Sequence, residues 1–469
     1  MAFQKKQSIF LVSAFVWIIL ALITVLACRQ LDVAIQKGDV DYWTLQQTTV
    51  SAEKSYQIFY SARIQKIERK EELTHIWLTP KRPEVNLNTP VMTLFVKGMM
   101  HITHKSFINS SVWVVLSLLS AAVSVMGFLY WMHNGWYARY FSLFLLSAWL
   151  SWPSLYAIQQ GQVSWFVLPV LVLGFMLHSL QYRKYAAITL GVLASLKLFF
   201  LIFVLLYVLR FEWRLLLLFF TAFLITFFLP LLYFSFHNYV QYFELLQNHT
   251  LIMNRTVAEM NGTILGFVAN IMRRLPLLDP LKVTLSVSSL CIFYGVWRWI
   301  CFDLKVIRTL PQFQNEIRFA FLIVLALLFS PLGWLYYFIF LMVPYAVISK
   351  VSCHYQVSKK VWIFLIAGLF LTFLCFIPLP KANSVLYFLK EIAVFFSLLC
   401  WLLSLRVVTY DVQNAMSSKR QSHYLIGFIP LCYALCSIIV FSGIPGGKYF
   451  WQWNKTDYQN TVAPTVVVT

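Results

Sequence analysis

The chain has 469 residues, of which 60% are apolar and only 12% are charged, and Lys and Arg outnumber Asp and Glu by 37 to 17. So apolar a composition excludes an ordinary soluble globular protein. The formal net charge of +20 does not indicate a nucleic-acid-binding protein, because the basic residues stand in short loops between apolar segments. There they orient membrane helices and attract anionic lipid.

Apolar runs long enough to cross a bilayer recur along the whole chain. A hydrocarbon core about 30 Å thick needs roughly 20 apolar residues per helix, and backbone in lipid must satisfy its own hydrogen bonds, which favours helices here. We therefore predict an all-α, polytopic integral membrane protein with about 11–13 transmembrane helices. The expected spans are residues 9–27, 111–132, 138–158, 163–181, 214–235, 281–302, 361–378, 384–405 and 423–443, together with two compound regions.

The first run, SIFLVSAFVWIILALITVLA at residues 8–27, follows the basic start MAFQKKQ. A signal peptide is the alternative. The run is about twice as long as a usual signal-peptide core and lacks a clear small-residue cleavage pattern. We interpret it as a retained helix, with the N-terminus in the cytoplasm.

The two compound regions follow from the positions of Lys and Arg. With a cytoplasmic N-terminus, both Lys184 and Arg210 lie on the inner side, so the residues between them must go out and return as two short helices with Lys197 at the turn. Residues 317–350 also begin and end inside, with SPLGW at their midpoint. Both midpoints are thus expected at the outer side.

Two long outer loops are expected, at residues 28–110 and 236–280. The first carries NLNTPVMTLFVKGMM, which is too short to span but apolar enough to form a short interfacial or re-entrant helix. We expect one transmembrane domain over residues 1–443 and an extracytoplasmic tail over residues 444–469.

Four segments together resemble a known family. The stretch GQVSWF…ASLKLFF is similar to the region of family-87 glycosyltransferases, of the GT-C superfold, in which a Gly-Gln turn opens a helix and a later Ser-x-Lys precedes another. In order along the chain, NLNTPVMTLF resembles that family's Asn-Pro-Pro segment, EMNGTILGFVANIMRR its Asn-x-Ser/Thr segment, and SPLGWLYYFIF its Ser-Pro-x-x-Trp segment. The resemblance covers roughly residues 36–345.

This resemblance implies an inverting transferase that moves a hexose, often mannose, from a polyprenyl-phosphate-sugar donor to a lipid or glycan acceptor hydroxyl on the extracytoplasmic side. The family's base is an Asp shortly after the first helix, which here means Asp39 or Asp41. An aromatic four residues later fits Asp39 with Trp43, and an aromatic directly after fits Asp41 with Tyr42. The alternative is that both are solvated loop acids.

The chemistry of the transfer reaction independently favours a carboxylate base at this position. A sugar phosphodiester already carries a good leaving group, so single displacement mainly needs one carboxylate to take the acceptor proton and cations for the departing phosphate. Lys197 is the first candidate for the phosphate, because a lysine within apolar helix is costly and by default marks function. Its alternative is a side chain snorkelling to the interface. Arg273 and Arg274 either add charge for the phosphate or anchor lipid headgroups.

Sugar or acceptor contacts are expected from Gln162, Asn88, Trp334, Tyr336, Tyr337 and Glu391. For Glu391 a local pair with Lys390 is the alternative, and for Gln162 a role in the turn. The family usually has His after the Ser-Pro-x-x-Trp segment, where this chain has Tyr336 and Tyr337. A phenol donates a hydrogen bond but offers no cation near neutral pH, which leaves the substrate less certain.

No metal and no cofactor is expected besides the donor itself, because neither a ligand cluster nor a phosphate-cradling Gly-rich loop stands in the sequence. The eight cysteines show no disulfide or metal pattern. The resemblance places the protein in a bacterial inner membrane. Two other functions stay open at this point: a transporter or flippase for a lipid-linked or anionic substrate, since broken helices also build transporter sites, and a non-catalytic assembly or polymer-ligase-like protein.

Overall fold

The computed structural model describes residues 18–19, 21–22, 24–25, 89–95, 110–132, 136–159, 162–233, 236, 239–240, 242–243, 261–272, 274–275, 280–331, 333–374, 384–414 and 429–437. In these ranges the regular structure is helical, apart from one isolated antiparallel bridge between Asn261 and Trp334. The predicted all-α class is confirmed.

The described helices follow in chain order. They are α5 (Ser110–Met132), α6 (Trp136–Trp149), α7 (Trp152–Gln159), α8 (Ser164–Ser179), α9 (Arg183–Leu196), η2 (Leu198–Val204), α10 (Leu205–Val208), α11 (Trp213–Phe228), η3 (Leu229–Leu232), α14 (Ile264–Met272), α15 (Pro280–Lys305), η4 (Ile307–Thr309), α16 (Gln314–Phe329), η5 (Leu335–Leu341), α17 (Met342–His354), α18 (Lys359–Leu374) and α19 (Ser384–Asn414). Residues 90–95 and 429–437 are also helical.

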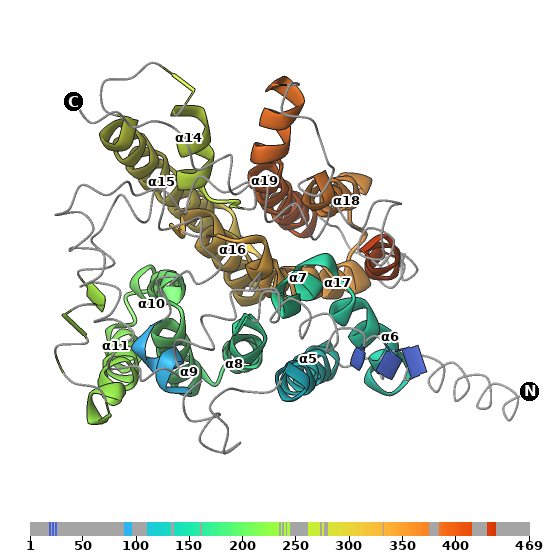
Figure 1. Ribbon diagram of the computed structural model, residues 1–469, viewed down its shortest axis with the longest axis horizontal. Coiled ribbons are helices and arrows are strands. Elements are labelled where there is room, and N and C mark those ends of the chain that lie inside the picture. The colour runs from blue at the N-terminus through green and yellow to red at the C-terminus, as the bar shows by residue number, and fades with distance from the viewer. Residues whose placement is uncertain are drawn as a thin grey trace, which may run out of the picture.

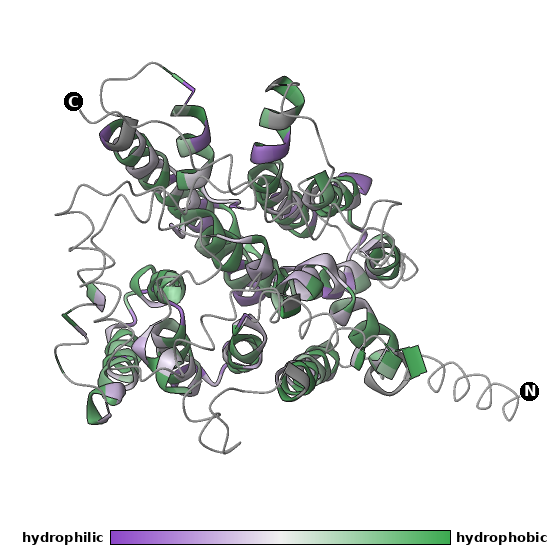
Figure 2. Ribbon diagram, in the orientation of Figure 1, coloured by the Kyte–Doolittle hydropathy of each residue, from purple (hydrophilic) through white to green (hydrophobic). Residues whose placement is uncertain are grey.

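Five of these helical stretches are long and apolar enough to cross a membrane, and six if the bent pair α6–α7 counts as one span. Apolar residues cover most of the helices in Figure 2, and large apolar side chains such as Phe293 on α15 and Leu217 on α11 are exposed, as lipid-facing residues are. The chain is therefore an integral membrane protein. The total of 11–13 spans stays a prediction, because part of the chain lies outside the described ranges.

Helix α16 forms the centre of the bundle (Figure 1). Every residue from Ile317 to Leu328 is buried, which is the pattern of a helix covered on all sides. It packs against α8, η2, α17 and α19. Elements that carry the predicted site residues are thus held around one rigid core helix.

Both compound regions break where the sequence predicted. Helix α9 ends at Leu196, Lys197 takes an extended conformation with φ of −144°, and η2 begins at Leu198. Helix α16 ends at Phe329, and η5 begins after Trp334. The span predicted at 138–158 differs from expectation, since α6 and α7 meet at an angle of 63°. Pro153 near the start of α7 lacks the N–H of a continuous helix, and at the bend the hydroxyl groups of Ser151 and Ser154 donate to the Ala148 carbonyl.

The contacts sort these segments into two ends of the bundle. At one end Arg183 pairs with Glu212 at 2.6 Å, Arg210 donates to Asn315, and the buried Arg318 pairs with Asp303. These belong to loops and helix ends that the charge pattern assigned to the inner side. At the other end Lys197 meets Tyr337, and Asn261 meets Trp334. The segment from Lys184 to Arg210 therefore starts and finishes at one end and turns towards the other.

Gly191 helps to fix the position of α9, the first helix of the segment from Lys184 to Arg210. A Cβ at this position would overlap with the backbone oxygen of Phe219, so α9 and α11 approach each other through a residue without a side chain, as small residues allow in membranes. Because α9 carries Lys197 at its end, this close approach helps to fix where that lysine stands.

We expect Gly191→Ala to destabilise the protein by about 1–3 kcal/mol, the usual effect of overpacking against atoms that cannot move aside. The matched control is Gly174→Ala on the neighbouring α8, where the nearest atom is the end of the Leu190 side chain at 2.8 Å and not a backbone atom. Thermal unfolding in detergent, followed by fluorescence, measures both. Equal melting temperatures for the two variants would contradict the role given to Gly191.

Candidate active site

The residues that the sequence singled out fall into three groups. Asp39, Asp41, Asn88 and Arg273 lie outside the described ranges. Gln162, Lys197, Trp334, Tyr336 and Tyr337 gather at one end of the bundle, as the contacts below show. Arg274 and Glu391 form a pair of their own.

The centre of this site is the side chain of Lys197. It is only 7% exposed, and its Nζ donates to the Oη of Tyr337 at 3.2 Å and lies 5.1 Å from the centre of that ring. A phenol gives an ammonium both a hydrogen-bond acceptor and a negative ring face. The snorkelling alternative does not describe this side chain, because it is buried against an aromatic ring of another helix.

Tyr337 belongs to η5, whose first turn is aromatic. Trp334 stacks on Tyr336 with centroids 6.2 Å apart, and Tyr336 also lies 6.0 Å from Tyr156 near the end of α7. Gln162 stands in the turn after α7, where it is buried and its backbone N–H donates to the Ala157 carbonyl. The turn that opens α8 and the segment after SPLGW are therefore neighbours.

A second link joins SPLGW to the segment NGT, residues 261–263. The Oδ1 of Asn261 accepts hydrogen bonds from the backbone N–H of Gly333 at 3.0 Å and of Thr263 at 3.3 Å, and Gly262 donates to the Gly333 carbonyl. A Cβ at Gly333 would lie 2.5 Å from the Thr263 side chain. Asn261 was not among the site residues predicted from the sequence, and its buried side chain fastens the second outer segment to the site.

The short helix at residues 90–95 joins the same end. Thr89 Oγ1 donates to the carbonyl of Leu196, the residue before Lys197, at 3.1 Å. Phe95 contacts Phe166 in the first turn of α8 at 5.6 Å. The short helix predicted in this segment is thus present, and residues 89–93 are buried.

The ion-pair partner of Glu391 is Arg274, which is far away in the sequence. The Glu391 carboxylate, 1% exposed, pairs with Arg274 at 2.8 Å, and the Arg274 guanidinium also lies over the Phe388 ring. Val394, one turn further along α19, lies within 2.9 Å of a Cβ built at Gly262. The pair therefore stands beside the NGT segment, where part of the Arg274 charge is neutralised by Glu391.

Chemically, this end of the bundle offers a sheltered cation, several phenols and stacked aromatic rings. Such a set suits an anionic ester together with a polar ring compound: the ammonium stabilises negative charge, phenols exchange hydrogen bonds, and flat rings cover apolar faces. No group of three or more potential metal ligands occurs within the described part of the chain.

The two buried asparagines of this region provide a matched test. Asn261→Ala leaves the buried Gly333 N–H without its acceptor, which costs about 1–3 kcal/mol. In Asn270→Ala the cost is expected to be near zero, since neither amide atom of Asn270 has a hydrogen-bond partner within the described ranges. We expect only the first to lower the melting temperature clearly. The reverse order of melting temperatures would contradict the proposed link.

Comparison with known proteins gives one clear result. The model of glycosyltransferase family 87 matches residues 86–331, just over half of the chain. The match begins at the NLNTP segment and ends within SPLGW, a narrower range than residues 36–345, and Asp39, Asp41, Tyr337 and Glu391 fall outside it. No curated protein and no solved structure matches the chain. The matched region contains α8, the break at Lys197 and the NGT segment, and the chain belongs to glycosyltransferase family 87.

Proposed function

We propose that this glycosyltransferase takes a hexose, with mannose as the first candidate, from a polyprenyl-phosphate-sugar and passes it to a lipid or glycan hydroxyl. The observation that carries the proposal is the Lys197 ammonium, buried within the apolar bundle and held by Tyr337. A buried cation in a membrane protein marks a functional site by default. A lipid-linked phosphate would reach such a cation from the bilayer.

In the proposed reaction the acceptor oxygen forms a bond to C1 of the sugar while the bond from C1 to the phosphate oxygen breaks. The electron pair of that bond leaves on the polyprenyl phosphate, and the acceptor proton passes to a carboxylate. One displacement inverts the configuration at C1. Lys197 would stabilise the charge that develops on the phosphate, as preorganised donors do in the transition state.

Asp39 or Asp41 is the proposed base. Both stand shortly after the first apolar segment, so a cytoplasmic N-terminus puts them on the side to which Lys197 turns. We place this side outside the cytoplasm, across a bacterial inner membrane. Residues two apart do not share a helix face, so at most one of the two acids would point at the acceptor.

The further contacts are proposed partly from the described geometry and, for Asn88 and Arg273, from the sequence alone. Trp334 and Tyr336 present stacked rings for a sugar, with Gln162 and Asn88 as candidate hydrogen-bonding groups. Arg274 would act on the phosphate only in part because it pairs with Glu391, and Arg273 is the neighbouring candidate. No metal ion or other cofactor is proposed. Membership of a glycosyltransferase family favours this enzyme over the transporter or flippase and over the assembly protein.

Incubation of the purified protein with labelled polyprenyl-phosphate-mannose and a membrane lipid extract tests the donor and the base together. We expect label transfer by the wild-type protein and a loss of about 10²-fold or more in Asp39→Asn or Asp41→Asn, the range for removal of a general base. Unchanged melting temperatures show that the variants fold. Full activity of both single variants and of the double variant would rule out the base assignment.

Tyr337→Phe tests how Lys197 is held. This variant keeps the ring but loses the hydroxyl that accepts from Lys197, so we expect the KM for the donor to rise about threefold to tenfold, equivalent to one hydrogen bond. Tyr207→Phe is the matched control, because the Tyr207 hydroxyl is buried without a partner among the described residues. Equal KM values in the two variants would show that the Tyr337 hydroxyl has no part in donor binding.

A further inference from the structure

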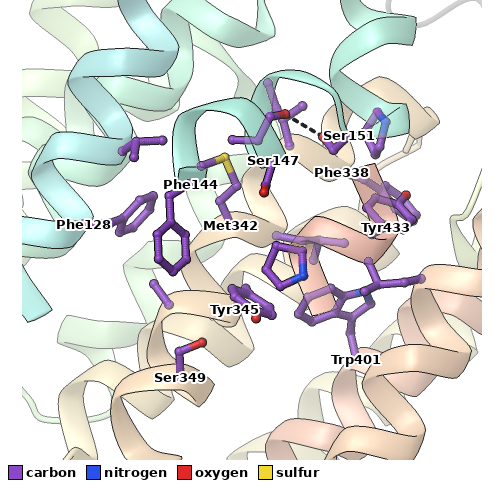
Figure 3. Close-up of a pocket in the computed structure, with 18 of the residues that line it drawn as sticks. Phe128, Phe144, Ser147, Ser151, Phe338, Met342, Tyr345, Ser349, Trp401 and Tyr433 are labelled. Atoms are coloured by element: carbon purple, nitrogen blue, oxygen red, sulfur yellow. Dashed lines mark hydrogen bonds between the residues drawn. The ribbon is translucent and has the colours of Figure 1, made fainter. Parts of the chain in front are cut away.

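A large apolar pocket lies on the other side of η5 from Lys197. It contains about 950 Å³ of empty space, which includes space open to the surroundings. Figure 3 shows its walls: Phe128 of α5, Phe144 of α6, Met342 and Tyr345 of α17, Trp401 of α19, and Tyr433 of the helix at residues 429–437. None of its lining residues is charged.

Three of the hydroxyl groups in its wall have hydrogen-bond partners within the wall. The Ser151 hydroxyl donates to the carbonyl of Ala148 on its own chain segment. Thr372 Oγ1 donates to the Leu369 carbonyl and lies 2.9 Å from the Tyr433 hydroxyl. Because these groups bond within the wall, the pocket favours an apolar occupant.

The geometry of η5 separates this pocket from the cation. A 3₁₀ helix has three residues per turn, so residues i and i+3 share a face. Tyr337 and Phe340 form the face that meets η2, with Tyr337 5.2 Å from Phe199 and Phe340 5.2 Å from Phe200. The other two faces, Phe338 with Leu341 and Ile339 with Met342, line the pocket. The η5 helix thus has the Lys197 ammonium on one side and the pocket on the other.

The pocket also has the direction and length of a lipid chain. Its lining continues from Phe338 to Ser349 along η5 and α17, a rise of about 18 Å at about 2.0 and 1.5 Å per residue in the two helix types. One leaflet of a hydrocarbon core of about 30 Å has about half that core's thickness. At the site end, Tyr336 shares a face with Ile339 and Met342 and contacts Tyr156 of α7, whose Pro153 lines the pocket.

We propose that this pocket holds the hydrocarbon chain of the acceptor, so that the acceptor is a lipid and not a water-soluble glycan. The inference rests on the proposed function, in which the donor phosphate lies against Lys197. The donor chain then belongs to the η2 side of η5. A second chain in the pocket places its polar head at the Trp334 and Tyr336 rings, next to the sugar that it receives.

Two variants that fill the pocket test this assignment, with one matched control. Val125→Phe places a ring in the pocket from α5, and Ala346→Leu fills it from α17. Val123→Phe makes the same change on α5 at a side chain that is 61% exposed. The assay measures transfer of label from polyprenyl-phosphate-mannose at increasing concentrations of membrane lipid extract, together with equilibrium binding of the labelled donor.

We expect both pocket variants to need about tenfold more extract for half-maximal transfer, comparable to the loss of one or two methylene contacts, with donor binding unchanged. Val123→Phe should match the wild-type protein, and the labelled product should be soluble in organic solvent. A water-soluble product, pocket variants that behave like Val123→Phe, or weakened donor binding in the pocket variants would each overturn the acceptor assignment. If the wild-type protein transfers no label at all, the proposed donor itself is wrong.

Discussion

The contact between the Lys197 ammonium and Tyr337 is the interaction on which the rest of the site depends. A charge inside an apolar bundle costs free energy unless polar groups surround it. The Lys197 ammonium has the phenol oxygen of Tyr337 at 3.2 Å. The contact requires α9 to stop at Leu196, since the extended conformation of Lys197 turns the chain from α9 into η2. It also requires η5 to lie against η2. The two breaks in the apolar segments are therefore parts of one arrangement.

The remaining links hold this arrangement from several directions. Asn261 fastens the NGT segment to Gly333 just before η5, Thr89 fastens the short helix 90–95 to the end of α9, and Gly191 lets α9 approach α11 closely. Each acts through backbone atoms, which move less than side chains. The result is a rigid frame around a cation, which suits stabilisation of charge that appears only as a bond breaks.

Much of the frame could be predicted from the sequence because the signals are local. Basic residues at both ends of residues 184–210 predicted two short helices with Lys197 at the turn, and α9 and η2 confirm them. The partners could not be predicted in the same way. Periodicity does not reveal that Lys197 meets a residue 140 positions away, nor that Arg274 pairs with Glu391. The role of Asn261 could not be predicted because its partner Gly333 is 72 positions away, and the pocket beside η5 is lined by residues of several separate helices.

The central claim about this site is that Lys197 binds a lipid-linked phosphate. Equilibrium binding of sugar-free polyprenyl phosphate and of the corresponding polyprenol, to the wild-type protein and to Lys197→Gln, isolates that question from catalysis. We predict that the wild-type protein prefers the phosphate by about tenfold or more, the usual strength of a hydrogen bond to a charged group, and that the variant loses this preference. The same preference in Lys197→Gln would contradict the account.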